Sequence, residues 1–220
     1  MALTLYYAPG ACSFVPHTLL ETIGAPYQRV MVRLHKGEQF GDEYHRINPR
    51  SQVPVLVDEA GEKITQVIAI VSYLAERYPQ LGFLPAQGLA RIRVLETLAW
   101  MNNTVHPTFT HIFRSALFTD DAKAQAQLKL FNTGLYRERL SELQQLLAAA
   151  QQNGWPYLGG ERFGPLDPYA LTLLRWGSIA GIDPNDYPLL WAFVQRLSQE
   201  PAVARAIEHE RLQLNLFQPR

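Results

Sequence analysis

The chain has 220 residues, with 20 basic residues balanced by 20 acidic ones, and 47% of the residues are hydrophobic. This length allows one or two domains with a substantial core, and the zero net charge argues against nucleic acid as a partner. No apolar run approaches the roughly 20 residues of a membrane helix, no secretory signal pattern is found, and a lone cysteine excludes an intramolecular disulfide. We therefore expect a cytoplasmic protein without membrane contact.

The first third of the chain alternates short strand-like and helix-like segments. Apolar patterning predicts strands at residues 3–7, 27–32, 55–58 and 63–64. It predicts helices at residues 14–23, which Gly24 ends, and at residues 67–77, which stop before Pro79. Strand, helix, strand, hairpin and helix is the element order of a thioredoxin-like α/β unit.

Strand patterns nearly vanish after a segment rich in Pro and Gly at residues 78–85. Apolar stripes at helical spacing cover residues 89–103 and 128–150. Three further helices are expected to begin near Pro165, Pro188 and Pro201, although Gly164 is a weaker N-cap than Ser or Thr. We therefore expect an α/β domain over residues 1–80 and an all-helical domain over residues 88–220.

Cys12 and Ser13 follow the Pro9-Gly10 turn and open the first expected helix. The N–H groups and positive dipole end of a helix N-terminus stabilise a thiolate. Ser13 could donate its hydroxyl hydrogen to the thiolate of a bound thiol, or Cys12 could form a mixed disulfide with that thiol. Alternatively, Cys12 is a small buried apolar residue. Tyr6 and Tyr7 are further O–H donors, ranked below Ser13.

A second candidate segment, Gln52-Val53-Pro54, precedes the third expected strand. Proline is tolerated at the first residue of a strand because it has no N–H to donate to the ladder. We expect a cis Val53–Pro54 bond at this junction. Such a loop would leave the N–H and C=O of Val53 available to pair with an extended peptide.

These motifs, in this order, resemble the cytosolic glutathione transferases. The bacterial beta class is the most similar, because it combines a Pro-Gly-x-Cys-Ser start with a Gln-Val-Pro loop and a His early in the helical domain. The resemblance covers essentially the whole chain. It implies the glutathione transferase fold, a thioredoxin-like α/β N-terminal domain followed by an all-α C-terminal domain, and a homodimer in which each chain's first domain meets the other's helical domain.

The resemblance also implies roles for individual residues. Gln66 and Val67 would hold the γ-glutamyl end of glutathione, although Val67 stands where the family commonly has Ser or Gly and lacks a hydroxyl for the ligand carboxylate. Lys36, next to His35, would pair with the glycyl carboxylate. His106 matches the beta-class His and could donate to a ligand carboxylate or assist proton transfer.

The implied activity is conjugation of the glutathione thiolate to hydrophobic electrophiles, as in detoxification. Five apolar residues cluster after His106, and most are expected to be core, with one face lining the electrophile's side of the site: Phe109, Ile112, Phe113, Leu117 and Phe118. The alternatives are a glutathione-dependent thiol–disulfide reductase that uses Cys12, and a non-catalytic transferase-like binding protein, which the Val67 departure favours. The sequence shows no metal-ligand spacing, so we expect glutathione as cosubstrate and no metal.

Overall fold

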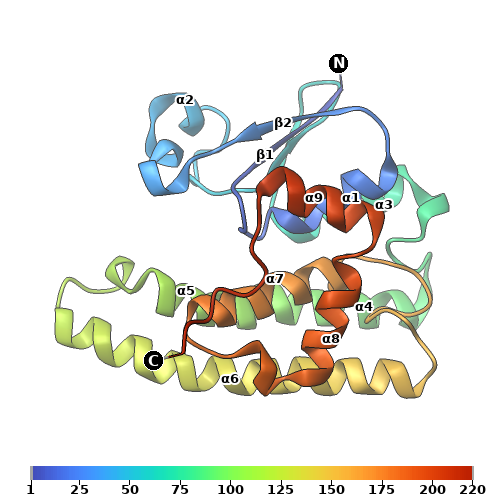
Figure 1. Cartoon of the computed structure of the whole chain (residues 1–220). Coiled ribbons are helices and arrows are strands. Elements are labelled where there is room, and N and C mark those ends of the chain that lie inside the picture. Colours follow the sequence, from blue (N-terminus) through green and yellow to red (C-terminus); the bar gives the residue numbers. More distant parts are fainter. Residues whose placement is uncertain (1, 220) are drawn as a thin grey trace.

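The computed structural model describes residues 2–219 and has a sheet-containing part followed by a helical part (Figure 1). The sheet has four strands in the order β2-β1-β3-β4, with β1 and β2 parallel and the other neighbours antiparallel. Its strands are β1 (Leu3–Tyr7), β2 (Tyr27–Met31), β3 (Val55–Val57) and β4 (Lys63–Thr65). Its helices are α1 (Phe14–Ile23), α2 (Asp42–His45) and α3 (Val67–Arg77). The predicted thioredoxin-like fold is confirmed.

The pattern of burial along β1 explains how the sheet is oriented. Leu3, Leu5 and Tyr7 are buried, while the residues between them are partly exposed, as expected for a strand whose side chains alternate between two faces. α1 packs on β1 and on α3. The loop after β1 leads from Tyr7 to Cys12 and Ser13 at the N-terminus of α1, and Ser13 bonds back to Ala8 beside the strand end.

The second part of the chain contains only helices among its described elements. They are α4 (Gly88–Trp100), α5 (His106–Phe113), α6 (Ala122–Gln152), α7 (Leu166–Ile179), α8 (Pro188–Leu197) and α9 (Pro201–Glu210). Pro188 and Pro201 begin helices as predicted, because a missing N–H costs nothing in the first turn. No helix within residues 2–219 is both long enough and apolar enough to cross a membrane.

Two helix boundaries differ from the sequence-based expectation. The helix predicted over residues 89–103 continues through a π-helical turn, Met101–Val105, into α5. α6 starts six residues before the predicted 128 because Asp121 caps it, accepting hydrogen bonds from the N–H groups of Lys123 and Ala124. The apolar stripe begins later than the cap, so periodicity alone placed the start too late.

Asp167 fixes the start of α7 from inside the core. Its fully buried carboxyl accepts hydrogen bonds from the N–H of Leu158 at 2.9 Å and of Gly164 at 2.8 Å. Burial raises the pKa of Asp167 to about 7, although both N–H groups favour the charged form. A Cβ on Gly164 would lie 3.0 Å from the carbonyl oxygen of Phe83, so close packing favours glycine there.

The last helix returns to the sheet-containing part. α9, red in Figure 1, lies beside α1 and packs against it. Buried apolar side chains from both parts form one continuous cluster, from Leu5 in β1 through Phe14 in α1 to Val203 in α9. This shared core holds the helical part rigidly against the end of β1, and the candidate active site lies at that junction.

Candidate active site

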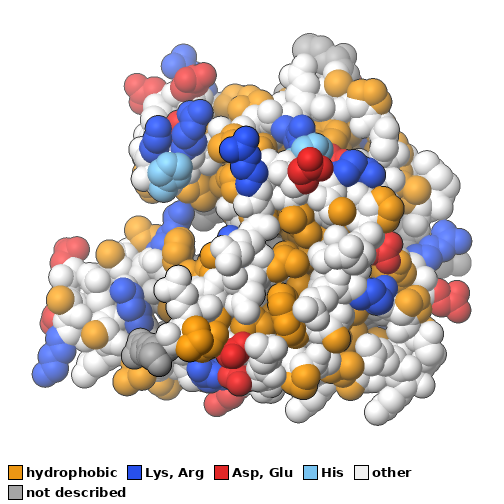
Figure 2. All heavy atoms as spheres, viewed as in Figure 1, with side chains coloured by type: hydrophobic (Ala, Val, Ile, Leu, Met, Phe, Trp, Pro, Cys, Tyr) orange, Lys and Arg blue, Asp and Glu red, His pale blue; other side chains and the backbone are white. Residues whose placement is uncertain are grey.

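A cavity of about 1300 Å³ lies where the two parts of the chain meet. One side is formed by the loop after β1, the loop before β3 and the N-terminus of α3, and the other side by α5 and α7. Figure 2 shows the molecular surface hollowed on this side, where the lobe that carries α2 overhangs α5. Single-ligand cavities usually enclose about 300–1,000 Å³, so this one has room for a peptide and a second molecule.

Cys12 lies in the wall of this cavity and is largely buried. Its Sγ lies 3.6 Å from the carbonyl oxygen of Val53 and is positioned to donate to it. Burial raises the pKa of the Cys12 thiol to about 12, even though the N–H groups of Cys12 and Ser13 at the start of α1 favour the thiolate. At neutral pH Cys12 is therefore a thiol, a hydrogen-bond donor rather than a ready nucleophile.

The structure places Ser13 differently from the sequence-based expectation. Its side chain is fully buried and does not line the cavity. Its hydroxyl donates to the carbonyl oxygen of Ala8 and accepts from the N–H of Ala8, both at 3.1 Å. The hydroxyl hydrogen is therefore already used to hold the loop after β1 closed, and Ser13 is not oriented toward a ligand.

The loop before β3 presents its backbone to the cavity. Gln52, Val53 and Pro54 all line it, and the Val53–Pro54 bond is cis, as the sequence predicted. The side chains of Tyr44 and Asn48 each donate to the carbonyl oxygen of Gln52 at 2.8 Å. These two anchors hold the loop so that the N–H of Val53, which pairs with no described backbone carbonyl, remains available.

Gln66 and Val67 stand at the N-terminus of α3 and both line the cavity. Gln66 has a left-handed φ of 71°, rare for a residue with a side chain. Backbone strain of this kind clusters at ligand-binding positions, where surrounding structure maintains it. The Val67 side chain is buried in the core, which leaves its N–H as the group it can offer at the helix start.

The structure does not bring Lys36 to the cavity. Lys36 is exposed on a short 3₁₀ turn, Leu34–Lys36, whereas its neighbour His35 lies in the cavity wall. Gln39, which the sequence analysis did not single out, is buried in that wall, and its Oε1 is buried without a hydrogen-bond partner. An unpaired buried amide oxygen is costly, so Gln39 is a candidate to accept a hydrogen bond from a ligand.

His106, the first residue of α5, faces the N-terminal loops across the cavity. Its Nδ1 lies 3.1 Å from the hydroxyl of Tyr169, which itself donates to Oδ1 of Asn102 at 3.2 Å. Because the Tyr169 hydrogen is used on Asn102, Nδ1 carries the imidazole proton and Nε2 keeps an unshared lone pair. Burial, together with the positive charge of Arg114, lowers the pKa of His106 to about 4, so the ring is neutral.

Beyond His106 the cavity wall is apolar. Phe109 stacks on Trp176 of α7 with the ring centroids 4.7 Å apart, and Phe113, Leu117 and Phe118 extend this lining. The last three are among the exposed large apolar side chains of the chain. Exposed contiguous apolar surface in a cavity is typical of a binding site for an apolar molecule.

Gly10 connects the two sides of the cavity. Its N–H donates to Oε2 of Glu210 at 2.7 Å, and its carbonyl oxygen accepts from Nε1 of Trp176 at 2.8 Å. Gly10 has a φ of 70°, and a Cβ there would lie 2.5 Å from Nη1 of Arg175. The left-handed φ favours glycine, and the two hydrogen bonds fix the loop before Cys12 to groups from α7 and α9.

Comparison with known proteins agrees with this architecture. Residues 1–76 match the N-terminal domain of glutathione S-transferases. The glutathione S-transferase GstA of Escherichia coli O157:H7 is 31% identical over 213 residues, 94% of this chain and 98% of that protein. The chain belongs to the glutathione S-transferase family.

Solved structures of the family superimpose over nearly the whole chain. A sphingomonad glutathione S-transferase complexed with glutathione has a TM-score of 0.81 and 31% identity, covering 96% of this chain and 100% of that one. The bacterial beta-class glutathione S-transferase of Sphingomonas chungbukensis has a TM-score of 0.82 and 30% identity over the same shares. The family, its beta-class likeness, the fold and the transferase class expected from the sequence are confirmed.

The glutathione S-transferase fold thus brings most of the predicted site residues to one cavity. Cys12, His106 and the Gln52–Pro54 loop meet there with the start of α3, whereas Ser13 and Lys36 do not line it. Sequence reasoning missed Gln39, Tyr169 and Trp176. No local motif marks these three residues, because each reaches the site from another element through the tertiary fold.

Proposed function

We propose that the protein binds glutathione along the loops of its α/β part and transfers the glutathione sulfur to an apolar electrophile held against α5. The observation that carries this proposal is one cavity whose polar end contains Cys12 and Val53 and whose other end is the Phe109–Trp176 stack. The likeness to a relative complexed with glutathione supports the choice of ligand.

Backbone pairing at Val53 would orient the ligand. The cysteinyl unit of glutathione pairs antiparallel with Val53, accepting from its N–H and donating to its carbonyl oxygen, as an added strand does. The γ-glutamyl end then reaches the N-terminus of α3, where the N–H of Val67 meets its carboxylate and the Gln66 amide binds its ammonium. The amide oxygen of Gln39 accepts a hydrogen bond from the remaining amide N–H of the ligand.

In this arrangement His106 and Cys12 flank the glutathione sulfur. The thiol hydrogen points to Nε2 of His106, which is neutral and keeps a lone pair. Loss of that proton to Nε2 leaves a thiolate, which accepts hydrogen bonds from the N–H groups at the start of α1. The Cys12 thiol hydrogen turns from the Val53 carbonyl to this thiolate. The negative ligand beside His106 favours the protonated ring, so binding itself raises the ring's proton affinity.

The thiolate then attacks the electrophilic carbon. For an aryl halide, the new S–C bond forms while the C–halogen bond breaks, and halide leaves with the bonding electron pair. The aromatic and aliphatic side chains beyond His106 exclude water from the acceptor, which strengthens the nucleophile. The apolar lining of the cavity therefore selects an apolar electrophile as the second substrate.

A thiol–disulfide reductase that uses Cys12 is the second candidate, because Cys12 Sγ lies beside the Val53 carbonyl where the ligand's cysteine would pair. A mixed disulfide would form when the Cys12 thiolate attacks oxidised glutathione and releases one glutathione thiolate. The raised pKa of Cys12 disfavours this reaction at neutral pH.

Calorimetric titration with glutathione tests the binding proposal. We expect saturable binding by the native protein and about tenfold weaker binding by Gln66→Ala, because one or two ligand hydrogen bonds are lost. Gln80→Ala is the matched control, since Gln80 is exposed and lies outside the cavity. Absence of heat at millimolar glutathione, or equal affinities of Gln66→Ala and native protein, contradicts the proposed site.

We also propose a homodimer and a division into domains at residues 1–80 and 88–220. Leu89 and Ile92 of α4 are 67% and 56% exposed, and such apolar surface at the start of the helical domain suits a two-fold contact. Light scattering should give about 50 kDa, twice the 25.0 kDa of the chain. A 25.0 kDa species at micromolar concentration would contradict the dimer.

A further inference from the structure

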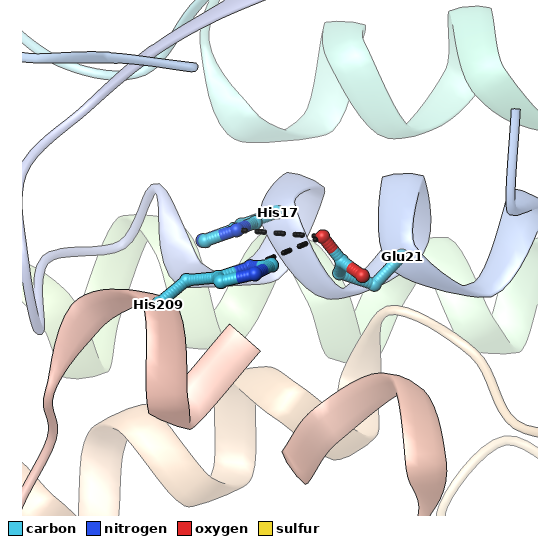
Figure 3. Close-up of side chains that lie close together, drawn as sticks. All are labelled: His17, Glu21 and His209. Atoms are coloured by element: carbon cyan, nitrogen blue, oxygen red, sulfur yellow. Dashed lines mark ion pairs between the residues drawn. The ribbon is translucent and has the colours of Figure 1, made fainter. Parts of the chain in front are cut away.

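Two histidines and a glutamate meet on the side of α1 that faces α9 (Figure 3). His17 and Glu21 lie one turn apart on α1, and His209 comes from the end of α9. Figure 3 shows both imidazole rings extending toward the Glu21 carboxylate, and the two rings stack with an interplanar angle of 8°. The ligand-type atoms of the three side chains all lie within 4.8 Å of one another.

Glu210 determines which nitrogen of His17 faces this cluster as an acceptor. Nδ1 of His17 lies 2.6 Å from Oε1 of Glu210, and both side chains are completely buried. A carboxylate only accepts, so Nδ1 carries a proton, and Nε2 is the ring nitrogen left to face the cluster. Nε2 is buried without a hydrogen-bond partner and faces Oε1 of Glu21 at 3.9 Å. These two atoms thus face each other without a hydrogen bond between them.

His209 adds a third atom to the same point. Its Nδ1 lies 3.3 Å from Oε1 of Glu21 and is also buried without a hydrogen-bond partner. A neutral imidazole is the form that binds metal ions.

The Glu21 carboxylate keeps capacity for a further partner. Arg205 donates to Oε2 at 2.8 Å, and the Tyr27 hydroxyl donates to Oε1 at 2.5 Å. A carboxylate offers about four lone-pair sites, so Oε1 can bind a cation while it accepts from Tyr27. Arg205 is half exposed, and solvent screens its charge.

We propose that His17 Nε2, Glu21 Oε1 and His209 Nδ1 bind a divalent transition metal ion of the zinc type. Two imidazoles and one carboxylate form an established donor set for such ions, whereas magnesium and calcium prefer oxygen ligands. Ligand atoms around tetrahedral zinc are separated by about 3.3 Å, given bonds of about 2.0–2.1 Å. The His209–Glu21 separation of 3.3 Å already fits, and the His17–Glu21 separation of 3.9 Å exceeds it by 0.6 Å.

Two further features support a metal ion. Glu210 hydrogen-bonds the non-coordinating nitrogen of His17, the carboxylate–histidine arrangement that orients metal-binding imidazoles. The His209 side chain is 30% exposed, so the cluster lies close to the molecular surface. Sequence reasoning expected no metal because it considered local spacing only, and His209 lies far from His17 in sequence.

The metal site is separate from the glutathione cavity, and none of its three ligands lines that cavity. Its role is to join α9 to α1. The Glu210 carboxyl that orients His17 also accepts the N–H of Gly10. The bound ion therefore stabilises the contact that holds the loop before Cys12, without touching the transferred sulfur.

Equilibrium dialysis of the untagged, chelator-stripped protein against Zn²⁺ at neutral pH tests this inference. We expect one equivalent of zinc per chain, and a Co²⁺-loaded sample should show the visible d–d bands of low-symmetry, imidazole-bound cobalt. His209→Ala should weaken zinc binding by about 100-fold or more, because even outer-shell substitutions cost 10- to 100-fold. His45→Ala is the matched control, since His45 is exposed on α2, and its affinity should equal that of the native protein.

Glu210→Gln provides a second variant and should weaken zinc binding by about 10- to 100-fold through His17. Zinc should also raise the Tm of the native protein, and leave that of His209→Ala unchanged. Binding below one equivalent, no d–d bands, or equal zinc affinity in His209→Ala and His45→Ala would overturn the inference. In each of these cases the three side chains interact through protons alone and bind no metal ion.

Discussion

Tyr169→Phe removes one oxygen atom that sets the tautomer of His106. That hydroxyl accepts from Nδ1 of His106 at 3.1 Å and donates to Oδ1 of Asn102 at 3.2 Å. Without it, Nδ1–H has no partner and the proton can move to Nε2, which then no longer accepts the glutathione thiol hydrogen. One neutral hydrogen bond contributes about 0.5–1.5 kcal/mol. We therefore expect kcat for conjugation to fall about 2- to 10-fold, with a smaller change in KM for glutathione.

A double-mutant cycle with an aryl halide as the electrophile separates this positioning role from a loss of packing. His106→Gln alone should lower kcat about 100-fold, the lower end of general-base contributions. In that background, Tyr169→Phe should have no further effect, because there is no imidazole left to orient. Equal losses in both backgrounds would refute the reasoning.

The pH–rate profile gives an independent check on the same residue. Because burial and Arg114 lower the pKa of His106 to about 4, the neutral ring persists well below pH 6.5 in the unliganded protein. We expect no step near pH 6.5 in kcat/KM, and a loss of rate only as pH falls toward 4. A step near 6.5 that disappears in His106→Gln would show that the ring titrates normally.

Three further outcomes follow from the site and the core. Mass spectrometry can follow adduct formation between Cys12 and oxidised glutathione. Because burial raises the pKa of Cys12 to about 12, this reaction should be slow at pH 7 and accelerate up to at least pH 10. A reaction rate independent of pH would contradict this. Ser13→Ala should reduce the unfolding free energy by about 1–3 kcal/mol, since it leaves the N–H of Ala8 unpaired. The pH–rate profile for conjugation should keep its shape. A shifted profile at unchanged stability would instead show that Ser13 stabilises the glutathione thiolate. Burial raises the pKa of Asp167 from 3.8 to about 7, so its contribution to stability is full below pH 3.8 and lost as pH rises through 7. In urea unfolding, the advantage of the native protein over Asp167→Asn should shrink by up to about 4 kcal/mol between pH 4 and pH 8, and an advantage that grows with pH would refute the assignment.

Local sequence patterns predicted the elements whose stability is local. β1 alternates buried and exposed residues, and α1 ends at a glycine with left-handed φ, so both were placed correctly. The short helix α2 carries no apolar stripe of its own and was missed. The continuation of α4 into α5 was also missed, because the π-helical turn between them shifts the register of the apolar stripe.

The candidate site was predicted only as far as its residues belong to motifs. The cis Val53–Pro54 loop and Cys12 follow from short stretches of sequence, and both line the cavity. Ser13 illustrates the limit, because the same Cys-Ser pair is compatible with a hydroxyl that faces a ligand or one that faces Ala8. Tyr169 and Trp176 act from α7 across the tertiary fold, and no periodicity in α7 distinguishes them from core residues.

Gly10 limits how this chain can be recombined with its relatives. Its N–H and C=O are held by Glu210 and Trp176, two residues from the helical half, and Arg175 occupies the space where a side chain would stand. A chimera that joins this α/β half to a foreign helical half inherits the Cys12 loop but not its supports. Shuffling at the 78–85 junction should therefore yield folded hybrids with weakened thiol chemistry, unless Trp176 and Glu210 are transferred together with the loop that they hold.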